Sequence, residues 1–264
     1  MLSLRNIVQA YRFKRDLARA MPALPPGERL TAAIARARED ALREDFVRTI
    51  ESRRAALLCD QSSIRVLDFG AGEIEALATV EESARGVYFD YTVSRVASAS
   101  KPKGWAILLH HLVREFKPLS IIEMGTCVGM SSCYMAAALR ANGRGHLETL
   151  EGDPSTAELA RATIAIMGYQ ELVSVNVGPF RDTLLPALQK YQPVDMVFVD
   201  GHHDGDATIA YFSEIRPFLS KGAIVVFDDI AWSHSMVAGW QAIAAHTDFG
   251  KAYDLGAMGV VVVS

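Results

Sequence analysis

The sequence is low in three features that would each point to a particular class of protein. Its 264 residues include only three cysteines, Cys59, Cys127 and Cys133, whose spacing is typical of neither a zinc site nor a disulfide framework. No basic run accompanies the net charge of −4, which gives no support to nucleic-acid binding. No stretch approaches the roughly 20 apolar residues that span a membrane. We therefore expect a cytoplasmic protein without nucleic-acid or membrane partners.

The N-terminal part of the chain has the pattern of helices. Residues 1–20 alternate apolar and charged positions like a short amphipathic helix, without the apolar core of a signal peptide. The prolines of residues 21–27 end it, because consecutive prolines cannot continue a helix. Residues 28–58 carry apolar residues at helical spacing, and a homodimer that packs through this helix is one hypothesis. Residues 92–117 are expected as two helical pieces, separated at 101–104 by Lys-Pro-Lys-Gly.

Residues 64–72, IRVLDFGAG, look like a nucleotide-binding strand and glycine turn. Asp90 lies 18 residues beyond Gly72, where a ribose-binding acid could stand. However, a fold that started at Ile64 would leave residues 91–120 as one irregular crossover and would add a surplus strand. We therefore predict an N-terminal strand or hairpin at 64–72, whose glycines serve a turn.

The chain is organised around residues 121–132, IIEMGTCVGMSS. Two branched apolar residues lead to the acid Glu123, then to a turn with Gly125 and Gly129, and then to hydroxyl residues that open a helical stretch. The glycines suit a turn with unusual backbone angles or a closely approaching ligand. The free N–H groups of the helix N-terminus would attract an anion such as a carboxylate.

Six further strands are expected after this turn, at residues 146–151, 172–177, 194–200, 222–228, 251–256 and 259–264. Helical segments separate the first five, as parallel βαβ units require. Only Ala257 and Met258 separate the last two, which predicts a hairpin. The predicted fold is α/β, with a Rossmann-like seven-stranded sheet that is mostly parallel and ends in an antiparallel hairpin. It would occupy residues 105–264, flanked by helices, with a mainly helical extension or lid over 1–104.

This combination of strands, glycine turn and acid resembles a class I S-adenosylmethionine-dependent methyltransferase. The stretch EMGTCVGMS is similar to the first motif of the catechol O-methyltransferase group, E-x-G-x-x-x-G-[YM]-S, and differs from the dinucleotide fingerprint G-x-G-x-x-G. The resemblance implies that Glu123 supports the turn and that Ser131 holds the carboxylate of the cofactor. It further implies that the methionine part faces Gly125, Thr126 and Gly129.

The ribose and adenine of the cofactor would lie at the next two strands. Glu151 ends the second strand, where a carboxylate can accept hydrogen bonds from both ribose hydroxyls, with Gly152 beside it. A surface acid is the alternative reading of Glu151. The resemblance places the adenine after the third strand, where Phe180 would cover the ring and Arg181 its edge. A core-packed aromatic is the alternative for Phe180.

Three acids end the fourth and fifth strands. Asp200 follows one strand, while Asp228 and Asp229 follow its expected neighbour, so their carboxylates should meet at one edge of the sheet. A divalent cation would relieve their repulsion, and an all-oxygen site suits Mg²⁺ or Ca²⁺. The matching positions of catechol-type and macrocin-type enzymes are metal ligands, which implies Mg²⁺ here, with Asp200 also beside the cofactor. The alternative is that Asp229 caps a helix near Trp232.

The loop after the fourth strand supplies two candidate general bases, His202 and His203. A histidine titrates near neutral pH and can accept a hydroxyl proton. The catechol enzymes carry Lys where His203 stands and the sugar enzymes carry Asp where His202 stands, so the choice between the two stays open.

The resulting hypothesis is metal-assisted O-methylation of a small hydroxylated molecule, either a sugar-bearing natural product or a catechol-like compound. One alternative is a metal-independent methyltransferase that uses histidine as the base. Another is a non-catalytic module of the same fold that binds the cofactor or a partner.

Overall fold

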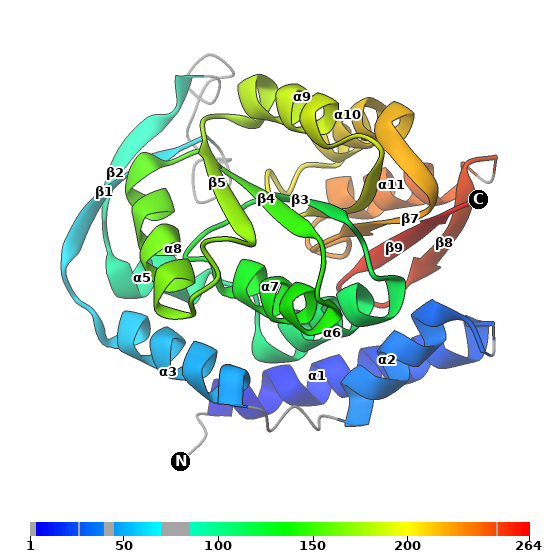
Figure 1. Ribbon diagram of the computed structural model, residues 1–264, viewed down its shortest axis with the longest axis horizontal. Helices are drawn as coiled ribbons and strands as arrows, with labels where there is room; N and C mark the ends of the chain where they lie inside the picture. The colour runs from blue at the N-terminus through cyan, green and yellow to red at the C-terminus, as the bar shows by residue number, and fades with distance from the viewer. Residues whose placement is uncertain (1–3, 26, 40–44, 70–84, 247) are drawn as a thin grey trace.

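The computed structural model describes residues 4–25, 27–39, 45–69, 85–246 and 248–264 (Figure 1). Its centre is a seven-stranded sheet made of β3 (Ser120–Met124), β4 (His146–Glu151), β5 (Val173–Val177), β6 (Val194–Val199), β7 (Leu219–Phe227), β8 (Gly250–Asp254) and β9 (Gly259–Val263). The spatial order is β5-β4-β3-β6-β7-β9-β8. Strands β3 to β7 pair in parallel, and β9 runs antiparallel to both β7 and β8. The predicted Rossmann-like sheet with its terminal hairpin is confirmed.

Helices cover both faces of the sheet, as they must where parallel strands are buried on both sides. One group comprises α6 (Lys103–Phe116), α7 (Met130–Asn142) and α8 (Pro154–Ile166); the other comprises α9 (Phe180–Tyr191), α10 (Gly205–Ile215), the short η3 (Arg216–Phe218) and α11 (His234–Ala244). In Figure 1, α6 and α7 lie below the sheet while α9 and α10 lie above it. Adjacent residues of β3 point to opposite faces of the sheet. Ile121 packs in the apolar cluster with α6 and α7, and Ile122 packs in the apolar cluster with α9, α10 and α11.

The central strand β3 lies where the strand order reverses. Its neighbours are β4, which follows it directly in the chain, and β6, which starts the opposite half of the sheet. In open α/β sheets the carboxyl ends of strands at such a switch point border the ligand crevice. The glycine turn after β3 therefore occupies the expected binding position.

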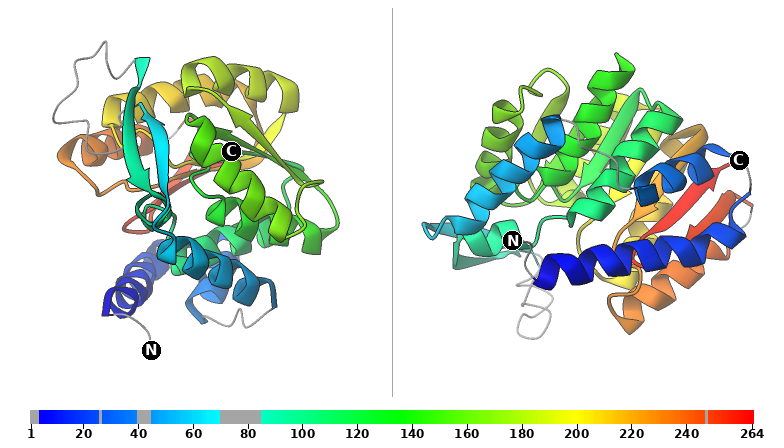
Figure 2. Two further views of the ribbon diagram at one scale, coloured as in Figure 1. Left: turned by 90° about the vertical axis from the view of Figure 1, so that its left-hand side faces the viewer. Right: turned by 90° about the horizontal axis from the view of Figure 1, so that it is seen from below.

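The N-terminal helices pack onto the same side of the sheet as α6 and α7. They are α1 (Leu4–Ala20), the short η1 (Met21–Ala23), α2 (Arg29–Glu39) and α3 (Asp45–Cys59). The helix predicted over 28–58 corresponds to α2 and α3; residues 40–44 between them lie outside the described residues. Buried residues of these helices share one apolar cluster with α6 and α7. The right-hand view of Figure 2 shows α1 crossing the underside of the molecule. The proposed domain division at residue 104 stays a prediction.

A separate two-stranded antiparallel sheet stands beside the main one. It pairs β1 (Ser63–Asp68) with β2 (Val87–Thr92), and Asp90 lies opposite Arg65 rather than at the end of a parallel strand. The predicted N-terminal hairpin is therefore present; Gly70 and Gly72 lie outside the described residues. Helix α5 (Val93–Ser98) follows, and Pro102 is the residue before α6, so the two predicted helical pieces are also found.

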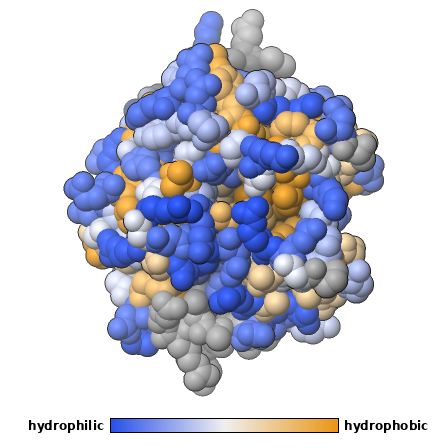
Figure 3. Space-filling view, turned by 45° about the vertical axis from the view of Figure 1, so that its right-hand side comes forward, coloured by the Kyte–Doolittle hydropathy of each residue, from blue (hydrophilic) through white to orange (hydrophobic). Residues whose placement is uncertain are grey.

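The surface is mixed in polarity. On the face seen in Figure 3, hydrophilic residues predominate and hydrophobic residues form separate smaller patches. None of the helices in the described part of the chain has the length and apolar character to cross a membrane.

Candidate active site

The turn between β3 and α7 is shaped by two glycines in the left-handed region. Gly125 has φ +97°, and a Cβ there would lie 1.9 Å from the carbonyl oxygen of Asp200. Its N–H donates to the Leu150 carbonyl oxygen at 3.0 Å, which ties the turn to β4. Gly129 has φ +80° and precedes the first residue of α7, so Ser131 lies in the first turn of that helix. Only glycine fits position 125, because any side chain would enter the backbone of the neighbouring strand.

Glu123 lies beneath this turn and is fully buried. Its carboxylate accepts hydrogen bonds from Ser132 and, at 2.7 Å, from Thr149, whose hydroxyl oxygen lies 2.6 Å from that of Thr126. Burial raises the pKa of Glu123 to about 7, although the hydroxyls of Ser131, Ser132 and Thr149 oppose the shift. The network links β3, β4 and the start of α7, which fits the supporting role that the resemblance implies for Glu123.

Glu151 presents its carboxylate to the other side of the turn. One oxygen accepts the Cys127 N–H at 2.8 Å and the other accepts the Asp153 N–H at 3.1 Å. Burial raises its pKa to about 7. Each carboxylate oxygen retains capacity for a further hydrogen bond, so the two oxygens can still accept a pair of ribose hydroxyls.

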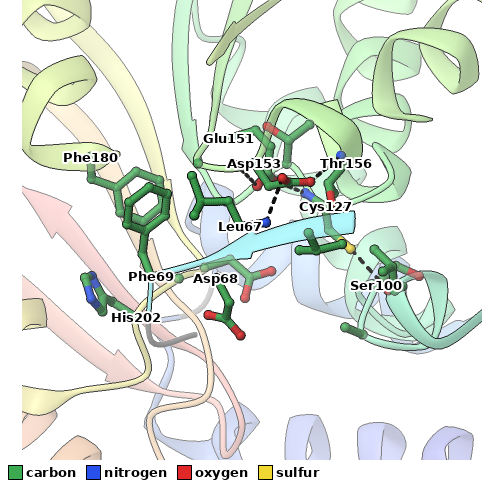
Figure 4. A pocket seen from close by; sticks show the side chains of 18 of the residues that line it. Leu67, Asp68, Phe69, Ser100, Cys127, Glu151, Asp153, Thr156, Phe180 and His202 are labelled. Atoms are coloured by element: carbon green, nitrogen blue, oxygen red, sulfur yellow. Dashed lines mark hydrogen bonds between the residues drawn. The ribbon is translucent and has the colours of Figure 1, made fainter. Parts of the chain in front are cut away.

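The N-terminal hairpin lies directly over this region. In Figure 4, β1 passes across the pocket, and a dashed line joins the Leu67 N–H to the Asp153 carboxylate, a distance of 2.8 Å. The other oxygen of Asp153 caps α8 by accepting the Thr156 N–H. A Cβ at Gly152 would lie 2.9 Å from the ring of Phe69, just beyond the end of β1. The missing side chain at position 152 thus leaves space for an aromatic ring from a distant segment.

Phe180 forms the opposite wall. Its ring lies against Gly201, where a Cβ would approach it to 2.8 Å, and packs edge-on against Tyr211 with ring centroids 5.8 Å apart. The guanidinium carbon of Arg181 stands 6.0 Å from the Phe69 ring centroid. The two predicted adenine contacts therefore border the pocket together with Phe69.

A cavity of about 610 Å³ connects these groups to Asp200 at the end of β6 and to the neighbouring Lys101, His202 and His203. Its lining includes the predicted cofactor residues Gly125, Thr126, Ser131, Glu151, Phe180 and Asp200. Residues 66–69 of the N-terminal hairpin and residues 99–101 before α6 contribute much of the remaining wall. Cofactor and acceptor ends therefore share one continuous space.

The three predicted acids converge, but they have different partners. The Asp200 N–H donates to the Met124 carbonyl oxygen at 2.9 Å, and the ammonium of Lys101 contacts Asp228 and lies 3.4 Å from Asp200. Burial raises the pKa of Asp200, an effect that Lys101 opposes and Asp229 reinforces. The predicted metal site on all three carboxylates does not fit this arrangement, because a cation of the chain itself already pairs with two of them.

The two histidines of the loop before α10 face different neighbours. The Nδ1 atom of His202 lies 2.7 Å from the Tyr211 hydroxyl. The Nδ1 atom of His203 lies 3.5 Å from Asp229, and its ring is 6.0 Å from that of Trp232, which is two-thirds exposed. Within the described residues, ligand atoms of Asp200, His203 and Asp229 lie within 4.8 Å of one another. This set, with an imidazole in place of Asp228, could hold a divalent cation.

Other predicted residues serve packing. His110 and His111 lie on α6; burial lowers the pKa of each to about 4, and His110 bonds the Tyr134 carbonyl. Trp240 is buried in the core. Phe69 and Lys101 were not predicted from the sequence. For Lys101, the excess of three acids at one sheet edge was a signal that could have prompted a search for a buried cation.

Comparisons with known proteins agree with this geometry. Residues 122–230 match the family model of a methyltransferase domain. The chain is 36% identical over 110 residues to a catechol O-methyltransferase of Mycobacterium tuberculosis, covering 42% of this chain and 47% of that protein. It is 27% identical over 172 residues to the catechol O-methyltransferase of Mus musculus, covering 61% of this chain and 64% of the mouse protein. The matches thus span about half to two-thirds of the relatives' lengths.

Solved structures show the same architecture. The O-methyltransferase TomG from Streptomyces achromogenes, involved in tomaymycin synthesis and solved with S-adenosylmethionine, is 28% identical, with a TM-score of 0.55 over 65% of this chain and 88% of its own. An O-methyltransferase from Bacillus cereus in complex with S-adenosylhomocysteine shares the fold, with 19% identity and a TM-score of 0.58. The match covers 86% of this chain and 94% of the Bacillus cereus chain. With its glycine turn and the acid at the end of β4, this part of the chain is therefore similar to a class I S-adenosylmethionine-dependent methyltransferase domain.

Proposed function

We propose that the chain transfers the methyl group of S-adenosylmethionine to a hydroxyl oxygen of a small molecule. The observation that carries this proposal is the continuous cavity, which joins the glycine turn and Glu151 to Asp200 and His203. A cofactor held at the turn would direct its methyl group toward an acceptor oxygen at the acidic end. Alignment of the two reactants in one enclosed space supplies much of the acceleration in such a transfer.

The acceptor class follows from the relatives. The two relatives described above are named catechol O-methyltransferases, and TomG is involved in tomaymycin synthesis. We therefore propose a catechol-like compound, and we retain a sugar-bearing natural product as the second class because Asp229 resembles the macrocin-type enzymes. The exposed Trp232 beside His203 offers a flat apolar surface against which a ring could pack.

His203 is the better placed of the two candidate bases. Asp229 lies 3.5 Å from its Nδ1 atom and can orient the ring so that Nε2 accepts the acceptor's proton. His202 instead has Nδ1 engaged with Tyr211. In this metal-independent form His203 would take the acceptor's proton. S-adenosylmethionine, held by the glycine turn and Glu151, would supply the methyl group and leave as S-adenosylhomocysteine.

The metal-assisted form remains the second candidate. Asp200, His203 and Asp229 would hold the cation, and a cation there would bind the acceptor oxygen and lower its pKa. The two carboxylates suit Mg²⁺ and Mn²⁺, whereas the imidazole would also admit metals such as Fe²⁺ and Zn²⁺. The two forms exclude each other at His203, which cannot be both a metal ligand and the proton acceptor.

The proposal is tested by isothermal titration calorimetry with S-adenosylhomocysteine, followed by methyl transfer from labelled S-adenosylmethionine to a panel of catechols and hydroxylated glycosides. His203→Ala should reduce turnover by about 10²- to 10⁴-fold and leave cofactor affinity unchanged. Turnover that survives exhaustive chelation would favour the metal-independent form. Tight cofactor binding without transfer to any acceptor would favour a non-catalytic binding module instead.

A further inference from the structure

Lys101 is a buried cation at the acceptor end of the cavity. Its side chain is 7% exposed, its ammonium contacts Asp228, and it lies 3.4 Å from Asp200. The side chain of Asp228 is 2% exposed, so solvent does not screen this ion pair. Lys101 also lines the cavity, so the ammonium adjoins the space in which an acceptor oxygen would lie.

The backbone around Lys101 is fixed on both sides. The hydroxyl of the preceding Ser100 donates to the Ala97 carbonyl oxygen at 2.6 Å and accepts from the Arg54 guanidinium at 2.7 Å. Pro102 follows as the residue that precedes α6. The lysine therefore enters the site from a fixed junction between two helices and not from an open loop.

The charges explain why a cation is needed at this position. Three carboxylates, those of Asp200, Asp228 and Asp229, meet at one edge of the sheet, and burying like charges together is unfavourable unless a cation compensates them. The Lys101 ammonium compensates Asp228 and Asp200 directly. A divalent cation that used Asp228 would have to displace the ammonium and would leave it buried without its partner.

We propose that Lys101 is the resident cation of the acceptor site. It keeps Asp228 from being a metal ligand and supplies positive charge beside the acceptor oxygen as that oxygen reacts. Any divalent cation then binds only through Asp200, His203 and Asp229, and binds weakly. This inference rests on the acceptor site proposed above, but its test does not require the acceptor.

The test is Mn²⁺ binding to the full chain saturated with S-adenosylhomocysteine, measured from the electron paramagnetic resonance signal of free Mn²⁺. Lys101→Met should bind Mn²⁺ at least tenfold more tightly than the unmodified protein, because Asp228 becomes available and a repelling charge is lost. Asp228→Asn alone should leave the affinity unchanged. Asp228→Asn combined with Lys101→Met should lose the part of the gain that Asp228 supplies and keep only the part that comes from the lost charge.

Two controls make the result specific. Lys103→Met removes an exposed lysine two residues away and should change nothing, whereas Lys101→Arg retains the charge and should retain weak binding. A tenfold or greater loss of Mn²⁺ affinity in Asp228→Asn would overturn the proposal, because Asp228 would then be a ligand. An unchanged or weaker affinity in Lys101→Met would overturn it as well. If Lys101→Met does not fold, the Asp228→Asn result alone decides.

Discussion

Protonation of Glu151 should control cofactor affinity in a pH range where most carboxylates are already ionised. Its burial raises the pKa to about 7, while both oxygens already accept backbone N–H groups from Cys127 and Asp153. The ionised carboxylate can accept hydrogen bonds from both ribose hydroxyls, whereas the protonated acid loses one acceptor position to its own proton. Affinity for S-adenosylhomocysteine should therefore rise with pH.

The magnitude follows from the titration of one group. With a pKa of about 7, about nine-tenths of Glu151 is ionised at pH 8 and about one-tenth at pH 6. If only the ionised form binds, the dissociation constant should increase about tenfold between pH 8 and pH 6, and about tenfold more for each further unit below.

The measurement is calorimetric titration with S-adenosylhomocysteine at half-unit steps between pH 5.5 and pH 8.5, with circular dichroism to verify that the fold persists. Glu151→Gln is the matched control, since it cannot ionise. It should bind more weakly than the unmodified protein at pH 8 and show a flat profile, so that the two affinities converge toward pH 5.5. A flat profile in the unmodified protein would refute the reasoning, as would an equal slope in the Gln variant.

Three further variants test other parts of the site. Gly125→Ala should lower cofactor affinity more than about tenfold and reduce the melting temperature, because its Cβ would lie 1.9 Å from the Asp200 carbonyl oxygen; unchanged melting would contradict this. Phe69→Ala should weaken S-adenosylhomocysteine binding about five- to hundredfold if the ring stacks on adenine, while Tyr88→Ala, on the exposed side of the hairpin, should not. Glu123→Gln should raise the free energy of unfolding, measured in urea at pH 8, by up to about 3 kcal/mol. The reason is that the raised pKa of Glu123 means that its ionised form destabilises the folded protein at pH 8. The gain should fade toward pH 5, where the carboxyl of the unmodified protein is protonated.

The sheet could be predicted from the sequence because its signals are local. Strands such as 194–199 and 259–263 are short, mostly apolar runs, and helical segments separate the parallel strands from one another. The two-residue separation at Ala257 and Met258 can only connect antiparallel neighbours. The turn at 125–129 could be predicted equally well, because glycine readily adopts the positive φ angles found at positions 125 and 129.

The pocket walls were less predictable because they depend on contacts between distant segments. Strand counting correctly kept residues 64–68 out of the main sheet, yet it could not show that the Leu67 N–H bonds Asp153, 86 residues later. The sequence pattern around Lys101 indicated only a break between helices. Its partners Asp200 and Asp228 become neighbours only when the sheet is assembled, so no periodicity encodes the pair.

The apolar cluster that the N-terminal helices share with α6 and α7 has a consequence for biosynthesis. Leu17 and Ile34 are synthesised well before α6 and α7, the helices that bury them. At a synthesis rate of about 5–20 residues per second, these apolar side chains remain exposed for several seconds. Lys101 likewise emerges long before its partner Asp228. Helices α1 and α2 are therefore candidates for chaperone contact during synthesis, and the acidic end of the cavity can assemble only after β7 has been made.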